Sequence, residues 1–220
     1  MFLPFLNVLA KSLSSTEAIV NGKVLFWPVD FTLVNYKYVF YDASFWRSFG
    51  ITVFVTVFGT FINLAATASL AYPLSRKEYV GRRYVLIMVL IAMIFTAPLI
   101  PNFILMRNLG LTNTLWALLL PQAISAFYFF IMRAFFMKIP GELIDSARID
   151  GCSELRMIWS IIIPLSKPVM ASLGIFYAVI HWNAYMNALY YVNDPSLWPL
   201  QVRLRQLIMA DELDIHSTSE

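Results

Sequence analysis

The sequence predicts an all-α protein, a polytopic bundle of transmembrane helices. Hydrophobic residues make up 60% of the chain and charged residues only 13%, whereas soluble domains contain about 25% charged residues. The mean hydropathy is +0.69, and long apolar blocks almost free of ionisable side chains alternate with short polar segments. These observations favour one helical membrane domain over the one or two soluble domains that 220 residues could otherwise form.

Four apolar blocks are long enough to cross a bilayer, which takes roughly 20 apolar residues. We expect complete spans at about 49–74, 84–106, 115–132 and 169–192. Pro98 and Pro101 interrupt the second block, where they must kink the helix or leave carbonyl groups free. The apolar stretch 1–13 is too short to cross, and residues 1–220 are expected to form a single transmembrane domain.

The polar segments predict how the chain is oriented. Segment 14–47 mixes polar and aromatic residues, as is typical of a membrane–water interface. Segments 74–83 and 133–168 carry nine basic residues, against seven in the longer polar segments that remain. By the positive-inside bias we expect these two segments on the cytoplasmic side. The one cysteine, Cys152, excludes an internal disulfide framework.

Segment 139–168 is a charged insert between two apolar blocks. With Lys138 at its edge, it holds eight of the 29 charged side chains of the chain. Pro140 is suited to the first turn of a helix, where its missing N–H would be unpaired anyway. Gly151 stops this helix, because glycine adopts the left-handed conformation of a helix C-cap at little cost. The sequence therefore predicts two short helices separated by a turn at Asp150 and Gly151.

The second helix of the insert is predicted to be amphipathic. Ser153 can cap its N-terminus, and Pro164 and Pro168 are expected to end it. Its apolar positions follow the spacing i, i+3, i+4 and i+7, which predicts one buried stripe: Leu155, Ile158, Trp159 and Ile162. On periodicity alone, an ordinary amphipathic connector on the membrane surface stays open as an alternative.

The same insert resembles a family motif. Residues Asp145 to Gly151, followed by Ile163, Pro164, Leu165 and Pro168, are similar to the EAA loop of membrane subunits of binding-protein-dependent ABC importers. That loop reads roughly E-A-A-x-x-D-G, a spacer, and then I-x-L-P. Asp145 stands where the family more often has Glu and Ser146 where it has the first Ala, so this acid keeps the charge but reaches less far.

The resemblance implies the fold of a type I ABC importer permease with a cytoplasmic coupling helix. In the family, this helix sits in a cleft of the ATPase subunit and carries its closing motion to the membrane helices. The residues that would couple to the ATPase are Asp145, Ser146, Ala147, Asp150, Gly151 and Pro164. Residues 1–13 resemble the outer half of the family's first transmembrane helix, so they are expected to be part of a first span. The family's last helix has no counterpart before Glu220, so the chain is expected to be a fragment or a truncated reading frame.

The resemblance also implies partners and a location. We expect a multi-pass protein of the cell inner membrane that forms a heterodimer with a second permease. Two ABC ATPase subunits and an extracytoplasmic solute-binding protein would complete the importer, with the lipid bilayer around it and no nucleic acid. The chain has no P-loop, so ATP and Mg²⁺ are expected in the partner ATPase and no cofactor in this chain.

The fourth block carries the candidate residues for a substrate path. Polar groups inside a membrane usually face a bundle interior or a water-filled path, and amides and aromatic faces can recognise sugar hydroxyls. The candidates are His181, Trp182, Asn183, Tyr185 and Asn187. Hydrogen bonding between helices, without contact to a substrate, is the alternative for these residues.

The order of residues in segment 11–47 and the stretch from Leu70 to Arg76 resemble the carbohydrate branch of the family. Oligosaccharide importers, including those for acidic sugars such as alginate, are the nearest resemblance. Importers of amino acids, peptides or ions share the loop and remain an alternative. A membrane-embedded enzyme or structural subunit is a weaker one, because His181 and Asp194 would lie about 20 Å apart along a helix and no nucleophile or metal set is evident.

Overall fold

A computed structural model describes residues 2–95 and 97–217, and the side chains of these up to Met209. All regular structure in these ranges is helical, in agreement with the predicted all-α fold. Contacts within the chain group it into two compact units, Met1–Phe49 and Gly50–Glu220. The boundary falls within a long helix, α4 (Ala43–Ser75).

The first unit contains three short helices, α1 (Leu3–Ser12), α2 (Thr16–Val20) and α3 (Val34–Tyr41). Its small core consists of Ala10, Ala18 and Val24. The buried hydroxyl of Ser14 donates to the carbonyl of Ala10 at 2.6 Å and accepts from the backbone N–H of Val29 at 3.0 Å. The predicted interface segment 14–47 is therefore a structured segment with its own hydrogen bonds.

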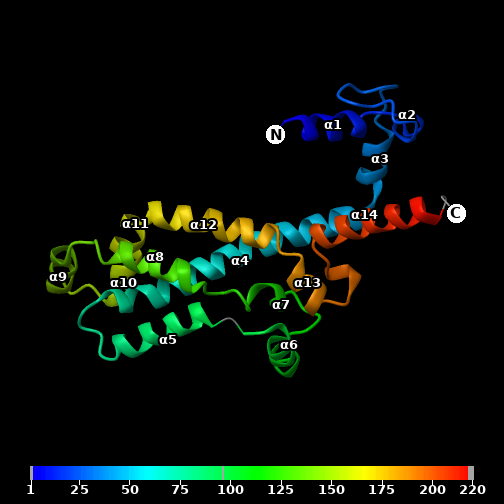
Figure 1. Ribbon diagram of the computed structural model, residues 1–220. Coiled ribbons are helices and arrows are strands. Elements are labelled where there is room, and N and C mark those ends of the chain that lie inside the picture. The colour runs from blue at the N-terminus through cyan, green and yellow to red at the C-terminus, as the bar shows by residue number, and fades with distance from the viewer. Residues whose placement is uncertain (1, 96, 218–220) are drawn as a thin grey trace. The chain divides into compact units, whose positions relative to one another are not determined.

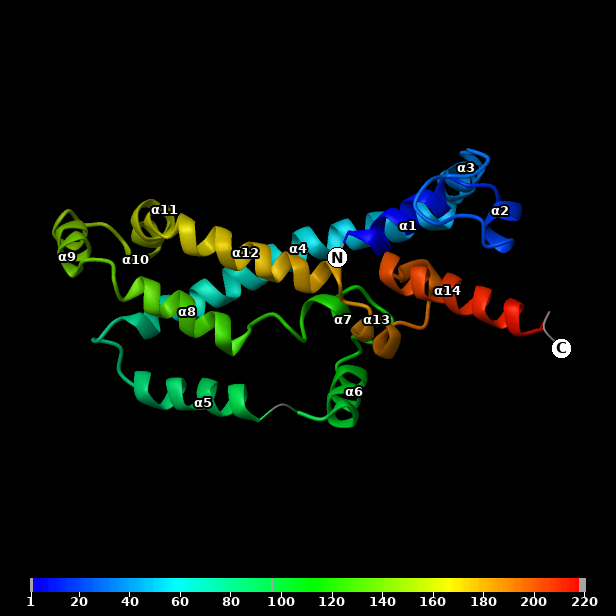
Figure 2. The same ribbon diagram turned by 45° about the horizontal axis from the view of Figure 1, so that its top comes forward.

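The second unit is built on α4, which contains the predicted span 49–74. Among the described residues, α4 is the only single helix long and apolar enough to cross a membrane. Helices α8 (Ala126–Phe136) and α12 (Lys167–Trp182) run beside it, as Figures 1 and 2 show from two directions. Their shared core includes Tyr72, Phe129, Met132 and Leu173.

The other predicted spans are broken helices. Block 84–106 consists of α5 (Arg82–Ile94) and α6 (Leu99–Asn108), bent by 119° relative to each other. Pro98 caps α6, so the expected interruption occurs at this proline. Block 115–132 consists of α7 (Trp116–Leu119), an irregular stretch that contains Pro121, and the first part of α8.

The last predicted span is also divided. Helix α12 ends at Trp182, and a short α13 (Met186–Tyr191) follows after a break. Helices α6 and α7 pack against α13, with the rings of Phe103 and Tyr191 stacked at 6.2 Å. A 3₁₀ turn (Pro195–Leu197) leads into α14 (Leu200–Ser217), and the backbone N–H of Leu200 donates to Thr52 Oγ1 of α4 at 2.8 Å.

The charged insert forms α9 (Gly141–Ile149), α10 (Glu154–Met157), a π-helical turn (Ile158–Ile162) and α11 (Ile163–Leu165). In both views these helices lie at one end of the second unit, and α13 and α14 lie at the other end (Figures 1 and 2). The long helices between them therefore connect the insert with the far end of this unit.

Candidate functional site

The turn at Gly151 is formed as predicted. Helix α9 ends at Ile149, and Gly151 has a φ of +75°. The N–H of Cys152 donates to the carbonyl of Ala147 at 2.9 Å, and the N–H of Gly151 donates to the carbonyl of Arg148 at 3.0 Å. This pair of bonds is the Schellman motif, which satisfies carbonyls at a helix C-terminus when the following residue is left-handed.

Helix α9 has one packed face and one free face. Ile144 and Ala147 are buried in the core of the second unit. The other predicted coupling residues of this helix and its turn, Asp145, Ser146, Asp150 and Gly151, are exposed. The small side chain of Ala147 therefore sets how closely α9 approaches its own chain, while the acids remain available to another protein.

The second half of the insert differs from the prediction. Ser153 caps α10 as expected, accepting from the N–H of Arg156 at 3.4 Å. The predicted stripe is wrong in part, because Ile162 is buried but Leu155 and Trp159 are 72% and 68% exposed. The π-helical turn at Ile158–Ile162 changes the helical period on which the positions of Trp159 and Ile162 were based, whereas Leu155 lies before this turn, in α10.

The helical segment ends at Leu165, one residue after Pro164, close to the predicted end of the regular pattern. Pro164 itself lies inside α11, directly after the π-helical turn. A proline lacks the N–H for an i→i−4 bond and its ring clashes with that carbonyl in a regular α-helix, and a π turn relieves this conflict by changing the bonding pattern. The segment from Glu154 to Leu165 then meets α12 at 80°.

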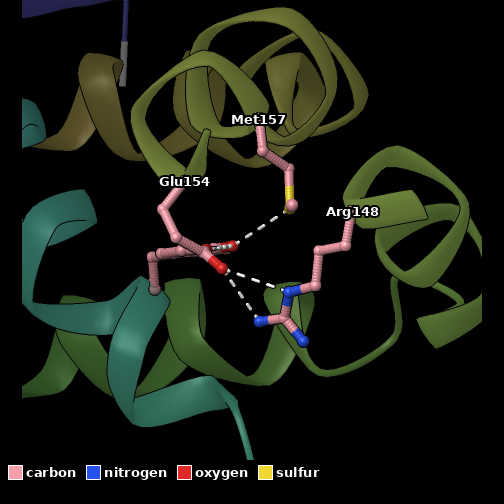
Figure 3. A network of polar contacts seen from close by, with 4 residues as sticks. Arg148, Glu154 and Met157 are labelled. Atoms are coloured by element: carbon pink, nitrogen blue, oxygen red, sulfur yellow. Dashed lines mark hydrogen bonds and ion pairs between the residues drawn. The ribbon is translucent and has the colours of Figure 1, made fainter. Parts of the chain in front are cut away.

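A hydrogen-bond network joins the insert to α4 (Figure 3). The Tyr72 hydroxyl of α4 donates to Glu154 Oε2 at 3.0 Å and lies 3.5 Å from Met157 Sδ. Arg148 of α9 forms an ion pair with Glu154 Oε1 at 2.9 Å. The guanidinium of Arg76 lies 5.2 Å from the centre of the Tyr72 ring. Both helices of the insert are thus connected to the end of α4.

The charge of Glu154 is stabilised by this network. Partial burial by itself would raise the pKa of Glu154, but the hydrogen bonds from Arg148 and Tyr72 outweigh it and hold the pKa below its ordinary value. Arg133 of α8 also donates to the carbonyl of Leu74 at 2.8 Å. The end of α4 is therefore held by two neighbours, so a displacement of the insert would act directly on this helix.

The structure divides the five candidate path residues. Asn183, Tyr185 and Asn187 line a cavity of about 170 Å³ together with Gln122. His181 is not part of it, because its ring is buried against Gly59 of α4. Trp182 is 38% exposed and does not line this cavity.

A larger cleft of about 460 Å³ contains polar residues that sequence reasoning did not select as site residues. Asn63, Gln122, Ser125 and Tyr177 line it, with apolar side chains between them. Gln122 and Ile180 belong to both cavities, which are therefore adjacent. The only signals in the sequence were an asparagine inside the first complete span and the Pro121–Gln122 pair inside the third.

Comparisons with known proteins identify the family. The protein-family model described as "Binding-protein-dependent transport system inner membrane component" matches residues 64–211. "Protein LplC" of Bacillus subtilis is 44% identical over 211 residues, which are 96% of this chain and 72% of that protein. The "Polygalacturonan/rhamnogalacturonan transport system permease protein YtcP" of the same organism is 42% identical over 94% of this chain and 72% of its own length.

A solved structure is similar as well. It is described as a bacterial ABC transporter involved in the import of the acidic polysaccharide alginate. It superimposes with a TM-score of 0.90 at 35% identity, covering 93% of this chain and 73% of that one. These findings confirm the expected permease fold, the carbohydrate branch, the inner-membrane location and a transport subunit rather than an enzyme. The chain belongs to the family of inner-membrane components of binding-protein-dependent transport systems.

Proposed function

We propose that this chain forms part of the membrane path of an ATP-driven oligosaccharide importer and receives the motion of its ATPase through α9. The observation that carries the proposal is the network of Tyr72, Glu154 and Arg148, which connects the exposed helix α9 to the long helix α4. A force applied to α9 from the cytoplasmic side would reach α4 through short polar contacts and a shared core.

The partners follow from the family and from the chain itself. A binding-protein-dependent system includes a solute-binding protein, and a chain without a P-loop needs an ATPase partner. We propose two ABC ATPase subunits, which bind the ATP and Mg²⁺, and a second, non-identical permease that completes the path. Purification of the full-length protein alone as a stable, transport-competent homodimer would contradict the heterodimer.

We infer that the substrate is an oligosaccharide that carries carboxylates. The names of YtcP and of the alginate importer support this class. The chain adds one observation, because the guanidinium of Arg205 lies 5.1 Å from the centre of the Tyr185 ring, beside the cavity lined by Asn183 and Asn187. A cation at this place would favour an anionic sugar. Uptake of labelled trigalacturonate and of maltotriose by the reconstituted importer tests the class.

The coupling proposal is tested with variants of α9 in the reconstituted importer. Asp145→Lys reverses the charge on the free face, and Ala147→Trp places a large side chain on the packed face. Both should abolish sugar-stimulated ATP hydrolysis and uptake, while membrane insertion stays intact because the insert lies outside the spans. Lys77→Glu, a charge reversal at an exposed residue elsewhere in the cytoplasmic segments, is the matched control and should leave both activities intact.

Two outcomes would contradict the coupling role of the insert. If Asp145→Lys and Ala147→Trp both support normal coupled transport, α9 is an ordinary amphipathic connector on the membrane surface. If Lys77→Glu is inactive as well, the loss in Asp145→Lys reflects surface charge in general and not the contact made by α9.

A further inference from the structure

The cleft of about 460 Å³ is formed where two broken spans meet α4 and α12. Its lining includes Ala92 and Met93, near the end of α5, and all residues from Pro121 to Phe127 except Ala123, around the start of α8. Asn63 comes from α4 and Tyr177 from α12. A volume of this size lies within the roughly 300–1,000 Å³ that is usual for small-molecule pockets.

Asn63 is the unusual residue in this lining. Its side chain is fully buried, and its Nδ2 donates to the carbonyl of Gln122 at 3.0 Å. Its Oδ1 has no hydrogen-bond partner among the residues that the structure describes. Because buried polar atoms are nearly always paired in proteins, an unpaired amide oxygen beside a cleft indicates a donor that comes from outside this chain.

The backbone around Gln122 supports the same conclusion. The stretch from Leu120 to Ser125 is not helical, although it lies inside an apolar block. Within the hydrocarbon region, irregular backbone is tolerated only where it is buried in protein or lines a water-filled cavity. Two side chains satisfy backbone groups of this stretch. Asn63 donates to the carbonyl of Gln122, and the Tyr177 hydroxyl accepts from the N–H of Ser125 at 3.2 Å. The break thus places amide and hydroxyl groups at the edge of one cleft.

We propose that this cleft is a hydroxyl-binding subsite for one ring of the sugar as it crosses the membrane. Asn63 Oδ1 accepts a hydrogen bond from a sugar hydroxyl, and the side-chain amide of Gln122 forms a hydrogen bond with a neighbouring hydroxyl. Phe127, which also lines the cleft, offers a flat apolar face to the ring. This proposal rests on the proposed function, and it assigns the sugar contact to residues other than the five predicted from the sequence.

The test uses the complete importer in lipid nanodiscs without its solute-binding protein, so that only the membrane site can bind sugar. Binding of labelled trigalacturonate and maltotriose is measured by equilibrium dialysis, and uptake is measured with the binding protein restored. Asn63→Leu and Gln122→Leu should each weaken sugar binding about tenfold, as expected for the loss of one hydrogen bond. Gln122 is exposed, so its variant tests the site even if Asn63→Leu does not fold.

Thr56→Val is the matched control. Thr56 also lies on α4 and has a buried hydroxyl without a hydrogen-bond partner among the described residues, but it does not line the cleft. This variant should bind sugar as the wild type does. Wild-type binding by Gln122→Leu and by any folded Asn63→Leu would overturn the subsite and leave a buried water as the partner of Asn63. A wild-type importer that takes up neither sugar would instead refute the proposed function.

Discussion

Replacement of Gly59 by alanine tests the packing of α4 against α12. A Cβ atom at this position would lie 2.5 Å from Nε2 of His181 and 2.6 Å and 2.7 Å from two carbons of the same ring. Carbon atoms in contact lie about 3.5 Å or more apart, so the two helices would have to separate by roughly 1 Å. His181 is only 3% exposed, so its ring cannot turn aside easily.

The expected cost follows from two opposing effects. Overpacking of a dense core costs about 1–3 kcal/mol, and alanine in place of glycine inside a helix returns up to about 1 kcal/mol. Gly59→Ala should therefore destabilise the folded permease by about 1–2 kcal/mol. For a protein of this size, that lowers the melting temperature by roughly 2–8 °C. Thermal unfolding of the purified importer in detergent measures the difference.

The same helix provides the control. Gly50 also lies on α4, but no atom lies within 4 Å of the Cβ that alanine would add there. Gly50→Ala should be neutral or slightly stabilising. In the double variant Gly59→Ala with His181→Ala, the clash is removed and the penalty of the glycine replacement should disappear. If Gly59→Ala melts at or above the temperature of Gly50→Ala, the close packing of α4 and α12 at His181 is refuted.

Four further predictions concern the insert and the topology. Gly151→Ala should destabilise the turn after α9 by about 1–2 kcal/mol, because alanine is strained in the left-handed backbone conformation of this position. The added Cβ would not clash with a neighbouring side chain. Hydrogen exchange of the insert measures this cost, and Gly151→Asn should show a smaller effect because asparagine tolerates this conformation. Tyr72→Phe should loosen the insert by about 1 kcal/mol, since it removes one hydrogen bond to a partly exposed carboxylate. Because the pKa of Glu154 is lowered in the folded state, its ion pair stabilises the insert above about pH 4.5. This contribution is lost as the pH falls below 4.5 towards the pKa of Glu154 in the folded protein. Hydrogen exchange of the insert should therefore become faster at this low pH in the wild type but not in Glu154→Gln. Finally, two cysteine variants in a background without Cys152 test the orientation of the chain. Lys138→Cys should react with a membrane-impermeant thiol reagent only from the cytoplasmic side, and Lys23→Cys only from outside. The opposite labelling would reverse the orientation.

Features that depend on composition or on neighbouring residues could be predicted from the sequence. The share of apolar residues identified a membrane protein, because charged side chains are too costly in lipid to occur in the spans. The turn at Gly151 was predictable because a left-handed C-cap involves only a few consecutive residues. The interruption at Pro98 was predictable for the same reason, since the missing N–H acts within one helical turn.

Contacts between distant segments were decided only by the tertiary structure. Tyr72 and Glu154 are separated by 82 positions, and Asn63 and Gln122 by 59. In a soluble helix the apolar stripe marks the packed face, but lipid is as apolar as leucine, so both faces of a membrane helix carry similar side chains. Periodicity therefore could not show that His181 packs on Gly59 or that Asn63 lines a cleft. These positions depend on which helices pack together and at what distance.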